Sequence, residues 1–277
     1  MKKTLVSLLF AATASLNVTA ADIDCGIVVG MPAGGLADIY ARTLQKLNNN
    51  IGRVENKVAT MQILAIDYMG YNPNFMLLAS PTMYSTQNPN KVPKVELIEM
   101  FMGYDLVAVT TKDITFKRLM TEKINIGIPL LGSAQHIIAL QLKDHNPLIE
   151  IIPTGGDAKA LILLVNKELD VYVSGKGNLS VWEEKYKLQT IIDIPAGKTI
   201  KKDNVTLRNF ATVAMWSHVS ATAEQKHKLT TCLNETTSNP LWPDEARRMG
   251  GVPLSLTKEE GKKLLEDFIA ALKKYDI

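Results

Sequence analysis

The stretch from Gly26 to Arg42 has the residue types of an anion-binding loop. It opens with an apolar run, Pro32 then fixes one bend, and Gly34 and Gly35 lack the side chains that would keep a ligand away from the backbone. An amphipathic helix follows, and the first N–H groups of a helix have no partner within it. These donors and the positive end of the helix dipole predict a carboxylate or phosphate site, although the same glycines would also serve simply to turn the chain.

Other reactive side chains indicate no enzyme. Ser133 and His136 lie three residues apart, like a nucleophile and its base, but a serine at a helix start is more often an N-cap or a ligand donor, and no Gly-x-Ser-x-Gly sequence surrounds it. The four histidines show no His-Glu-x-x-His spacing, and the two cysteines lie far apart. We therefore expect no catalytic residue, no metal and no cofactor.

The first residues have the pattern of a secretory signal peptide. Two lysines precede an apolar run, and small residues follow, so we expect residues 1–21 to be a signal cleaved after Ala20 or Ala21. The run is shorter than the roughly 20 apolar residues that a membrane anchor needs. The residues before Cys25 do not suit a lipoprotein. The mature protein is therefore expected to be soluble and outside the cytoplasm.

Length and composition suit a globular protein of two lobes. The chain has 277 residues, and its formal net charge of +3 falls to +1 when the two lysines of the signal are removed. A protein with so little net charge has no large positive field, so we expect no binding of nucleic acid. Hydrophobic residues make up 46% of the chain, and no later segment is apolar enough to cross a bilayer.

The two cysteines, Cys25 and Cys232, have two interpretations in an oxidising compartment. In the first interpretation they form a disulfide, which would place both ends of the chain in one lobe. In the second they are two buried free thiols that behave as small hydrophobic residues.

Strand-like and helix-like segments alternate along the chain, which indicates an α/β protein. We expect early strands at 25–30, 75–79 and 106–109, and helices at 36–47, 61–69 and 116–120. In the middle, strands at 124–128, 149–152, 169–173 and 188–194 alternate with helices at 134–142, 158–166 and 179–187. This order predicts a parallel sheet that binds ligands at the carboxyl ends of its strands.

The C-terminal part of the chain is expected to be helical. Residues 198–204 are interpreted as a surface loop or a link between lobes. Helices are expected at 222–234 and 243–249, and a capping box at Thr257 opens the last helix.

Four segments together resemble a known family. Met31–Arg42, Val54–Lys57, Gly132–His136 and Ile152–Leu161 are similar, in this order, to signatures of the substrate-binding receptors of tripartite tricarboxylate transporters, the Bug family. The resemblance covers about Ile27 to Val173. It implies a type II-like periplasmic binding protein with two lobes, each a mainly parallel sheet flanked by helices, joined by crossing strands.

The same resemblance implies the site and the partners. Lobe 1 would comprise residues 22–112 and 213–277, and lobe 2 residues 113–212. A monomer in the periplasm would close on a small organic acid and deliver it to membrane permease subunits. The implied ligand-binding residues are Pro32, Ala33, Gly34, Gly35 and Asp38 in lobe 1, and Gly132, Ser133, Thr154, Gly155 and Gly156 in lobe 2. Asp38 would mainly order its loop.

The chain also departs from the family pattern. Ile128 and Leu130 stand where a threonine and a glycine are usual, and Ala59 replaces another glycine. The pocket is therefore expected to be more apolar on the side of lobe 2, because its ligand has a larger hydrophobic body or because binding of small diacids has been lost.

Two further hypotheses accompany the receptor. A ligand-sensing partner of a signalling protein would use the same scaffold, because fold does not fix the partner. A secreted hydrolase would need a base and an orienting residue that the sequence does not supply.

Overall fold

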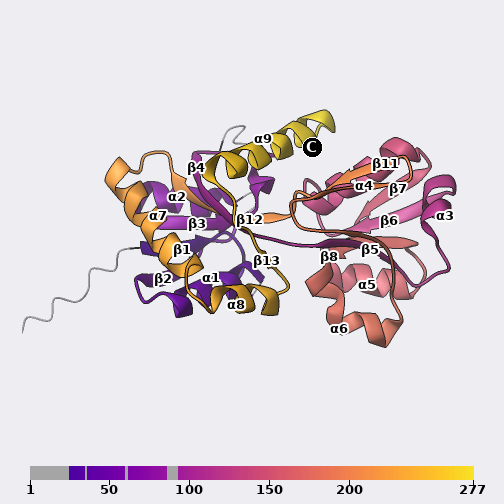
Figure 1. Ribbon diagram of the computed structural model, residues 1–277, viewed down its shortest axis with the longest axis horizontal. Coiled ribbons are helices and arrows are strands. Elements are labelled where there is room, and N and C mark those ends of the chain that lie inside the picture. The colour runs from indigo at the N-terminus through magenta and orange to yellow at the C-terminus, as the bar shows by residue number, and fades with distance from the viewer. Residues whose placement is uncertain (1–24, 35, 60–61, 86–92) are drawn as a thin grey trace, which may run out of the picture.

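The protein consists of two lobes, each built around its own β-sheet (Figure 1). The computed structural model describes residues 25–34, 36–59, 62–85 and 93–277. The expected signal peptide and Gly35 lie outside these residues. Within them, no helix is both long and apolar enough to cross a membrane.

Lobe 1 contains a six-stranded mixed sheet. Its order is β13 (Val252–Pro253), β4 (Val95–Gly103), β12 (Thr212–His218), β3 (Phe75–Ala79), β1 (Cys25–Val29) and β2 (Ile51–Asn56). Strands β1, β2 and β3 are parallel, and β12 is antiparallel to both β3 and β4. Strand β4 therefore runs in the same direction as β1 to β3.

Helices cover both faces of this sheet, which explains why β1 is a continuous apolar run. Ile27 and Val29 pack with α1 (Leu36–Leu47), α7 (Ala223–Thr237) and α8 (Trp242–Arg248). Val28 points to the other face, where α2 (Ile63–Tyr71) and α9 (Lys258–Lys274) contribute to the core. Alternate residues of a strand face opposite sides, so a strand that is buried on both sides has no polar position.

Lobe 2 contains a five-stranded sheet. Its order is β7 (Ile149–Pro153), β6 (Ile124–Ile128), β8 (Val171–Gly175), β5 (Leu106–Thr110) and β9 (Gln189–Ile194). The helices of this lobe are α3 (Phe116–Thr121), α4 (Ala134–His145), α5 (Asp157–Val165) and α6 (Lys176–Tyr186). A short 3-10 helix, η2 (Pro81–Tyr84), follows β3 in lobe 1.

The four strands expected to be parallel, β6, β7, β8 and β9, do run in one direction, but a fifth strand, β5, lies among them. Strands β6, β7 and β8 are parallel, but β5 lies between β8 and β9 and is antiparallel to both. All five residues of β5 are buried, so this strand fits the centre of a sheet and not its edge. The chain therefore changes sheets between β4 and β5, earlier than the lobe boundary expected after residue 112.

The polar stretch at 198–204 is part of a hairpin, which corrects its interpretation as a loop. Strands β10 (Thr199–Lys202) and β11 (Val205–Arg208) pair antiparallel, with Lys202 opposite Val205. Asp203 turns the chain with a left-handed φ of 51°, a conformation that aspartate tolerates better than most residues. Val205 and Leu207 are buried while Thr206 is exposed, so the hairpin is held to lobe 2 by one apolar face.

The two crossings between the lobes are hydrogen-bonded to each other through Asn209. Its Nδ2 donates to the carbonyl oxygens of Tyr104, at 2.7 Å, and Ile194, at 2.8 Å. Its Oδ1 accepts from the Ala211 N–H at 2.7 Å. The Tyr104 N–H in turn donates to the Ala211 carbonyl at 3.0 Å. Asn209 is completely buried, so both crossing segments are held by one satisfied side chain.

Helix α9 contacts both lobes (Figure 1). Gly261 packs beside Leu97 of β4 in lobe 1. Toward lobe 2, the rings of Phe268 and Phe210 have centroids 5.8 Å apart, and Asp267 pairs with Arg208 at 2.7 Å. The Thr257 capping box predicted for its N-terminus is confirmed. The helix therefore lies across the junction of the lobes as well as on lobe 1.

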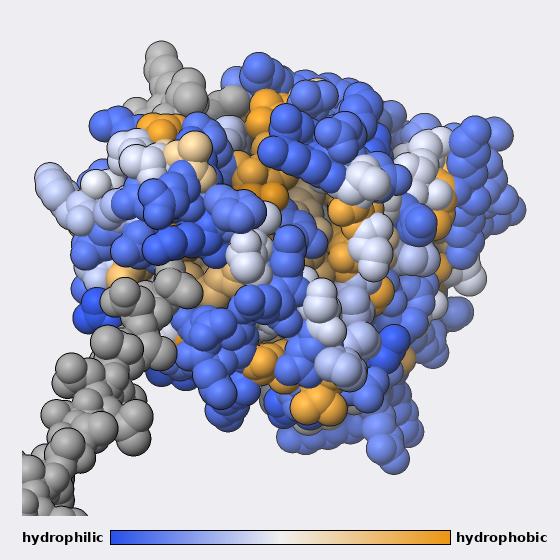
Figure 2. Space-filling model, turned by 60° about the vertical axis from the view of Figure 1, so that its left-hand side comes forward, coloured by the Kyte–Doolittle hydropathy of each residue, from blue (hydrophilic) through white to orange (hydrophobic). Residues whose placement is uncertain are grey.

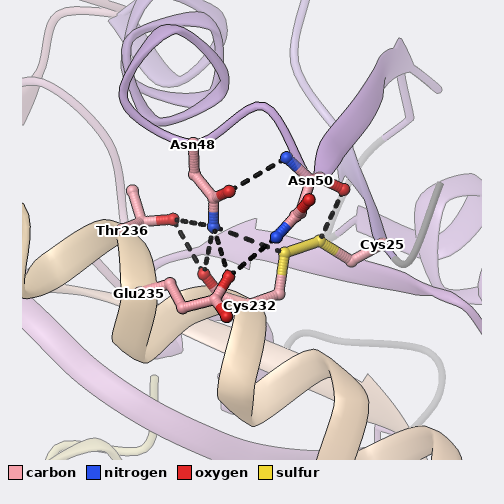
Figure 3. The surroundings of a disulfide bond; sticks show 6 residues. All are labelled: Cys25, Asn48, Asn50, Cys232, Glu235 and Thr236. Atoms are coloured by element: carbon pink, nitrogen blue, oxygen red, sulfur yellow. Dashed lines mark hydrogen bonds between the residues drawn. A yellow bond between two sulfur atoms is a disulfide. The ribbon is translucent and has the colours of Figure 1, made fainter. Parts of the chain in front are cut away.

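A disulfide between Cys25 and Cys232 joins β1 to α7, with Cα atoms 6.7 Å apart (Figure 3). Asn48, just beyond α1, surrounds it with hydrogen bonds: Nδ2 donates to the Cys232 carbonyl at 2.9 Å and to Thr236 Oγ1 at 3.2 Å. Asn50 Nδ2 adds a bond to Glu235 at 3.0 Å. The first strand and a late helix therefore share lobe 1.

We expect removal of this disulfide to destabilise the protein strongly. The bond closes a loop with a sequence separation of 207 residues, so a Cys25→Ser/Cys232→Ser variant should lose about 2–5 kcal/mol of unfolding free energy, mainly because its unfolded chain is less constrained. Urea unfolding of the oxidised protein and the variant measures the difference. Equal midpoints and slopes would contradict the expectation.

Candidate functional site

The directions of the strands bring the loops of the two lobes to facing edges. Strand β4 leaves lobe 1 at the edge where β1, β2 and β3 also end, and the chain enters lobe 2 at β5. Because β8 is antiparallel to β5, the carboxyl ends of β6, β7 and β8 point back toward lobe 1. A Cβ atom added to Gly132 would lie 3.3 Å from Ser85 Oγ, so the loop after β6 lies close to lobe 1.

In lobe 1 the loop after β1 is exposed. Pro32, Ala33 and Gly34 are all accessible to solvent. Gly34 has φ of 78° and open space where a Cβ would lie, so a glycine is needed here by the backbone conformation and not by crowding. Figure 2 shows a largely hydrophilic surface with a hollow near the middle of the molecule that hydrophobic residues line.

Asp38 accepts a hydrogen bond from one of the backbone N–H groups that could otherwise bind an anion in this loop. Its Oδ2 accepts from the Gly34 N–H at 2.9 Å and from Arg42 Nε at 3.0 Å. Burial acts to raise the pKa of Asp38, but the hydrogen bonds from Arg42, Gly34 and Asn56 outweigh it, and the pKa lies below its ordinary value. The carboxylate is therefore ionised at neutral pH, and the Gly34 N–H is already used to order the loop.

Gln62 lies beside this loop and is not one of the site residues expected from the sequence. It precedes α2 with a left-handed φ of 63°, and its side chain is 9% exposed. A Cβ added to Gly30 would come within 1.9 Å of Gln62 Oε1, and that oxygen has no hydrogen-bond partner in the described part of the chain. Gln62 therefore combines a strained backbone with an unpaired buried acceptor. No local sequence pattern predicts either feature.

In lobe 2 the loop after β6 is fixed by its own polar groups. Ser133 Oγ donates to the Leu130 carbonyl at 2.7 Å and accepts from the His136 N–H at 3.2 Å. The Gly132 N–H donates to His136 Nδ1 at 3.1 Å. Ser133 is thus the N-cap of α4, and its hydroxyl hydrogen points to a carbonyl and not to the imidazole ring. The two residues do not form a nucleophile and base.

The loop after β7 is tied to the loop after β6 but leaves its helix uncapped. The Gly155 N–H donates to the Pro129 carbonyl at 3.0 Å, and the Thr154 hydroxyl lies 3.0 Å from the Ile128 carbonyl. Gly155 and Gly156 have φ of 81° and 144°, with nothing within 4 Å of either Cβ position. No side chain caps α5 in the part of the chain that the structure describes, so its first N–H groups remain available.

Asp157, the first residue of α5, is hydrogen-bonded to side chains of β8 and α6. Its Oδ1 accepts from the hydroxyls of Tyr172, at 2.5 Å, and Ser174, at 2.7 Å, and its Oδ2 accepts from Asn178 Nδ2 at 3.2 Å. Burial raises the pKa of Tyr172, and Asp157 raises it further, so the tyrosine remains a donor. Tyr172 and Ser174 share one face of β8 by strand alternation, but their pairing with Asp157 depends on the tertiary fold.

The expected site residues thus fall on two facing edges. Pro32, Ala33, Gly34 and Asp38 lie on the edge of lobe 1, and Gly132, Ser133, Thr154, Gly155 and Gly156 lie on the edge of lobe 2. Gly35 lies outside the described residues. Among the described residues, no three His, Cys, Asp or Glu side chains are grouped so as to hold a metal ion.

The contact between His136 and Gly132 predicts a dependence on pH. Burial lowers the pKa of His136 below its ordinary 6.5, so the folded protein keeps a neutral ring that accepts the Gly132 N–H. This stabilisation is complete above the pKa of the unfolded chain and is lost as the pH falls below it. We expect a His136→Asn variant, whose amide oxygen can replace Nδ1, to lose less stability than the wild type between pH 7.5 and pH 5.

Urea unfolding at both pH values measures this difference. Burial and Lys94 also lower the pKa of His218, against a smaller opposite effect of Asp67, but this histidine is present in both proteins and cancels in the comparison. Parallel loss of stability in the wild type and the variant would refute the assignment to His136.

Comparison with solved structures shows where this architecture occurs. A TctC solute-binding protein from Polaromonas is 14% identical and superposes with a TM-score of 0.67 over 90% of this chain and 98% of the other. The periplasmic binding protein BugD is 20% identical, with a TM-score of 0.64 over 90% and 96% of the two chains. The R. palustris protein Rpa4515, solved with adipate, is 15% identical, with a TM-score of 0.69 over 91% and 95%.

Comparisons at the level of sequence find no match. No family model matches the chain, and no curated protein matches it. The likeness to the solved structures extends over about nine tenths of the chain and over both lobes. The protein therefore has the two-lobed α/β fold of the TctC and Bug-type periplasmic binding proteins.

Proposed function

We propose that this protein is a periplasmic solute-binding receptor that captures a small carboxylated molecule between its lobes and delivers it to a membrane permease of the tripartite tricarboxylate type. The observation that carries the proposal is the uncapped N-terminus of α5, which opens on the edge of lobe 2 that faces lobe 1. The likeness of the fold to solute-binding proteins, one of them solved with adipate, supports it.

The chemistry of this helix end suits a carboxylate. The N–H groups of Asp157, Ala158 and Lys159 have no partner within the helix, and the helix dipole adds a partial positive charge. Gly155 and Gly156, which precede them, carry no side chain and have open space where a Cβ would lie, so an anion could approach the backbone closely. Helix α4 offers no equivalent site, because Ser133 caps it.

Lobe 1 supplies the opposite wall in this proposal. Pro32, Ala33, Gly34 and Gly35 would line it, and Asp38 would keep the loop in shape. In this proposal the lobes would move relative to each other at the two crossing segments, which Asn209 joins, and a bound molecule would hold the lobes together. The remaining expected residues, Gly132, Ser133 and Thr154, would mainly set the backbone of the facing loops.

The proposed location and role follow from the same reasoning. Residues 1–21 would direct the protein to the periplasm, where Cys25 and Cys232 can oxidise. The Ser133 and His136 geometry offers no activated nucleophile, which favours a receptor over a hydrolase.

A charge placed beside the helix end tests the carboxylate site. Ala158 is exposed in the first turn of α5. An Ala158→Glu variant should keep or slightly raise stability, because an acid in the first turn gains about 0.3–1 kcal/mol from the dipole. The same acid should weaken carboxylate binding at least about tenfold, a loss of about 1.4 kcal/mol, by competing for the N–H groups. Ala158→Gln is the uncharged control and should bind more tightly than the glutamate variant.

The measurement is a thermal-shift screen of protein purified from the periplasm against mono-, di- and tricarboxylates, followed by calorimetry on any acid that binds. A ligand at 100 times its Kd should stabilise the native state by about 2.7 kcal/mol. The proposal fails if no carboxylate shifts the melting temperature, or if both Ala158 variants bind an acid as tightly as the wild type.

A further inference from the structure

Two adjacent leucines are exposed on the edge of lobe 2 that faces lobe 1. Leu130 is 52% exposed and Leu131 is 45% exposed. They occupy the loop between β6 and α4, directly before Gly132, which lies close to Ser85 of lobe 1. Large apolar side chains at such a position lose contact with water only if something covers them.

The backbone that carries these leucines is rigid. Ser133 Oγ holds the Leu130 carbonyl, His136 holds the Gly132 N–H, and the Gly155 N–H holds the Pro129 carbonyl. Three hydrogen bonds therefore hold the loop while both leucines remain about half exposed. A surface ordered before it binds loses less conformational entropy on binding.

Lobe 1 presents a matching apolar residue on its facing loop. Met31 is 41% exposed, and its carbonyl accepts from Asn56 Nδ2 at 3.1 Å. As in the leucine loop, a hydrogen bond holds the backbone of Met31 while its side chain is partly exposed. A methionine side chain is flexible and packs against irregular apolar shapes, so it can contact ligands of different shape.

The two leucines adjoin the open end of α5. The bond from Gly155 to Pro129 joins the uncapped helix end directly to the loop of the two leucines. A polar anchor and an apolar wall are thus continuous on lobe 2. A ligand that satisfies both has a carboxylate at one end and a hydrocarbon body next to it.

We infer that Leu130, Leu131 and Met31 form the apolar wall of the ligand site and select carboxylates with an alkyl or aryl body over short, fully polar acids. This inference rests on the proposed function and specifies its ligand class. Burial of hydrocarbon against this wall lowers the free energy of binding, so affinity depends on the length of the hydrocarbon chain of the ligand.

The test is a series of straight-chain monocarboxylates from butanoate to octanoate, with the uncharged primary amides of the same acids as a parallel series. Calorimetry on the wild-type protein gives Kd for each. Affinity for the acids is expected to rise by about fourfold per methylene until the wall is covered, the gain that burial of one methylene provides.

Variants locate the effect. Leu130→Ser/Leu131→Ser should reduce the gain to less than about twofold per methylene, and Met31→Ser should reduce it from the opposite lobe without touching the leucine loop. Leu148→Ser is the matched control, because Leu148 is 57% exposed but lies between α4 and the start of β7, at the far end of the lobe 2 sheet. Urea unfolding confirms that each variant is folded.

The outcomes separate this inference from the proposed function. Acids that bind with no dependence on chain length, or a gain that survives both sets of substitutions, would overturn the apolar wall and leave the carboxylate receptor intact. Amides that bind with the length dependence while acids do not would support the wall and overturn the carboxylate site. Binding of neither series would overturn both. If the leucines serve only to meet Met31 on closure, substitution would change the radius of gyration of the free protein but not the dependence on chain length.

Discussion

The site depends on the way in which the chain crosses twice between the lobes. One crossing follows β4 and the other precedes β12, and Asn209 hydrogen-bonds the two segments to each other. Because β4 runs parallel to β1, β2 and β3, the first crossing sets which edge of lobe 1 faces lobe 2. The antiparallel placement of β5 beside β8 then turns the carboxyl ends of β6, β7 and β8 back toward lobe 1. Loops remote in sequence become opposite walls through these pairings alone.

Two further ties stabilise the arrangement of the lobes at this junction. The disulfide joins β1 to α7 within lobe 1, so it makes that lobe a firmer body without linking it to lobe 2. Helix α9 does link them, through Phe268 against Phe210 and through a hydrogen bond of 2.7 Å from the Tyr275 hydroxyl to Asp144. The exposed polar contacts of α9 are individually weak, whereas its apolar contacts belong to a core shared by both lobes. Any closure of the proposed receptor would therefore have to conserve the apolar contacts more than the polar ones.

The sequence predicts those parts of this arrangement that depend on local chemistry. The apolar run at β1 and the Thr257 capping box that opens α9 are visible without any tertiary information, because burial on two faces and helix capping each require particular residue types. The place of β5 in the sheet of lobe 2 is not visible in this way, since a buried apolar strand carries no sign of which neighbours it pairs with. The hairpin at β10 and β11 is hidden for a different reason: its polar composition matches that of a loop, and only alternate burial of Val205 and Leu207 distinguishes it.

The two lobes also differ in the electrostatics of their edges, although each has a glycine loop that leads into a helix. In lobe 1 an internal carboxylate, Asp38, takes up the Gly34 N–H, so this loop has less capacity for an external anion than its sequence suggests. In lobe 2 the carboxylate of Asp157 is held by three donors from β8 and α6, and the end of α5 is left open. An acidic side chain in the first turn of a helix is favoured by the dipole in both cases, and the sequence alone gives the same reading for the two. They differ in the donors that each aspartate uses: Asp38 takes a backbone N–H of its own loop, whereas Asp157 is held by side chains of β8 and α6. In the proposed receptor this difference would leave lobe 2 better able to bind the carboxylate of a ligand.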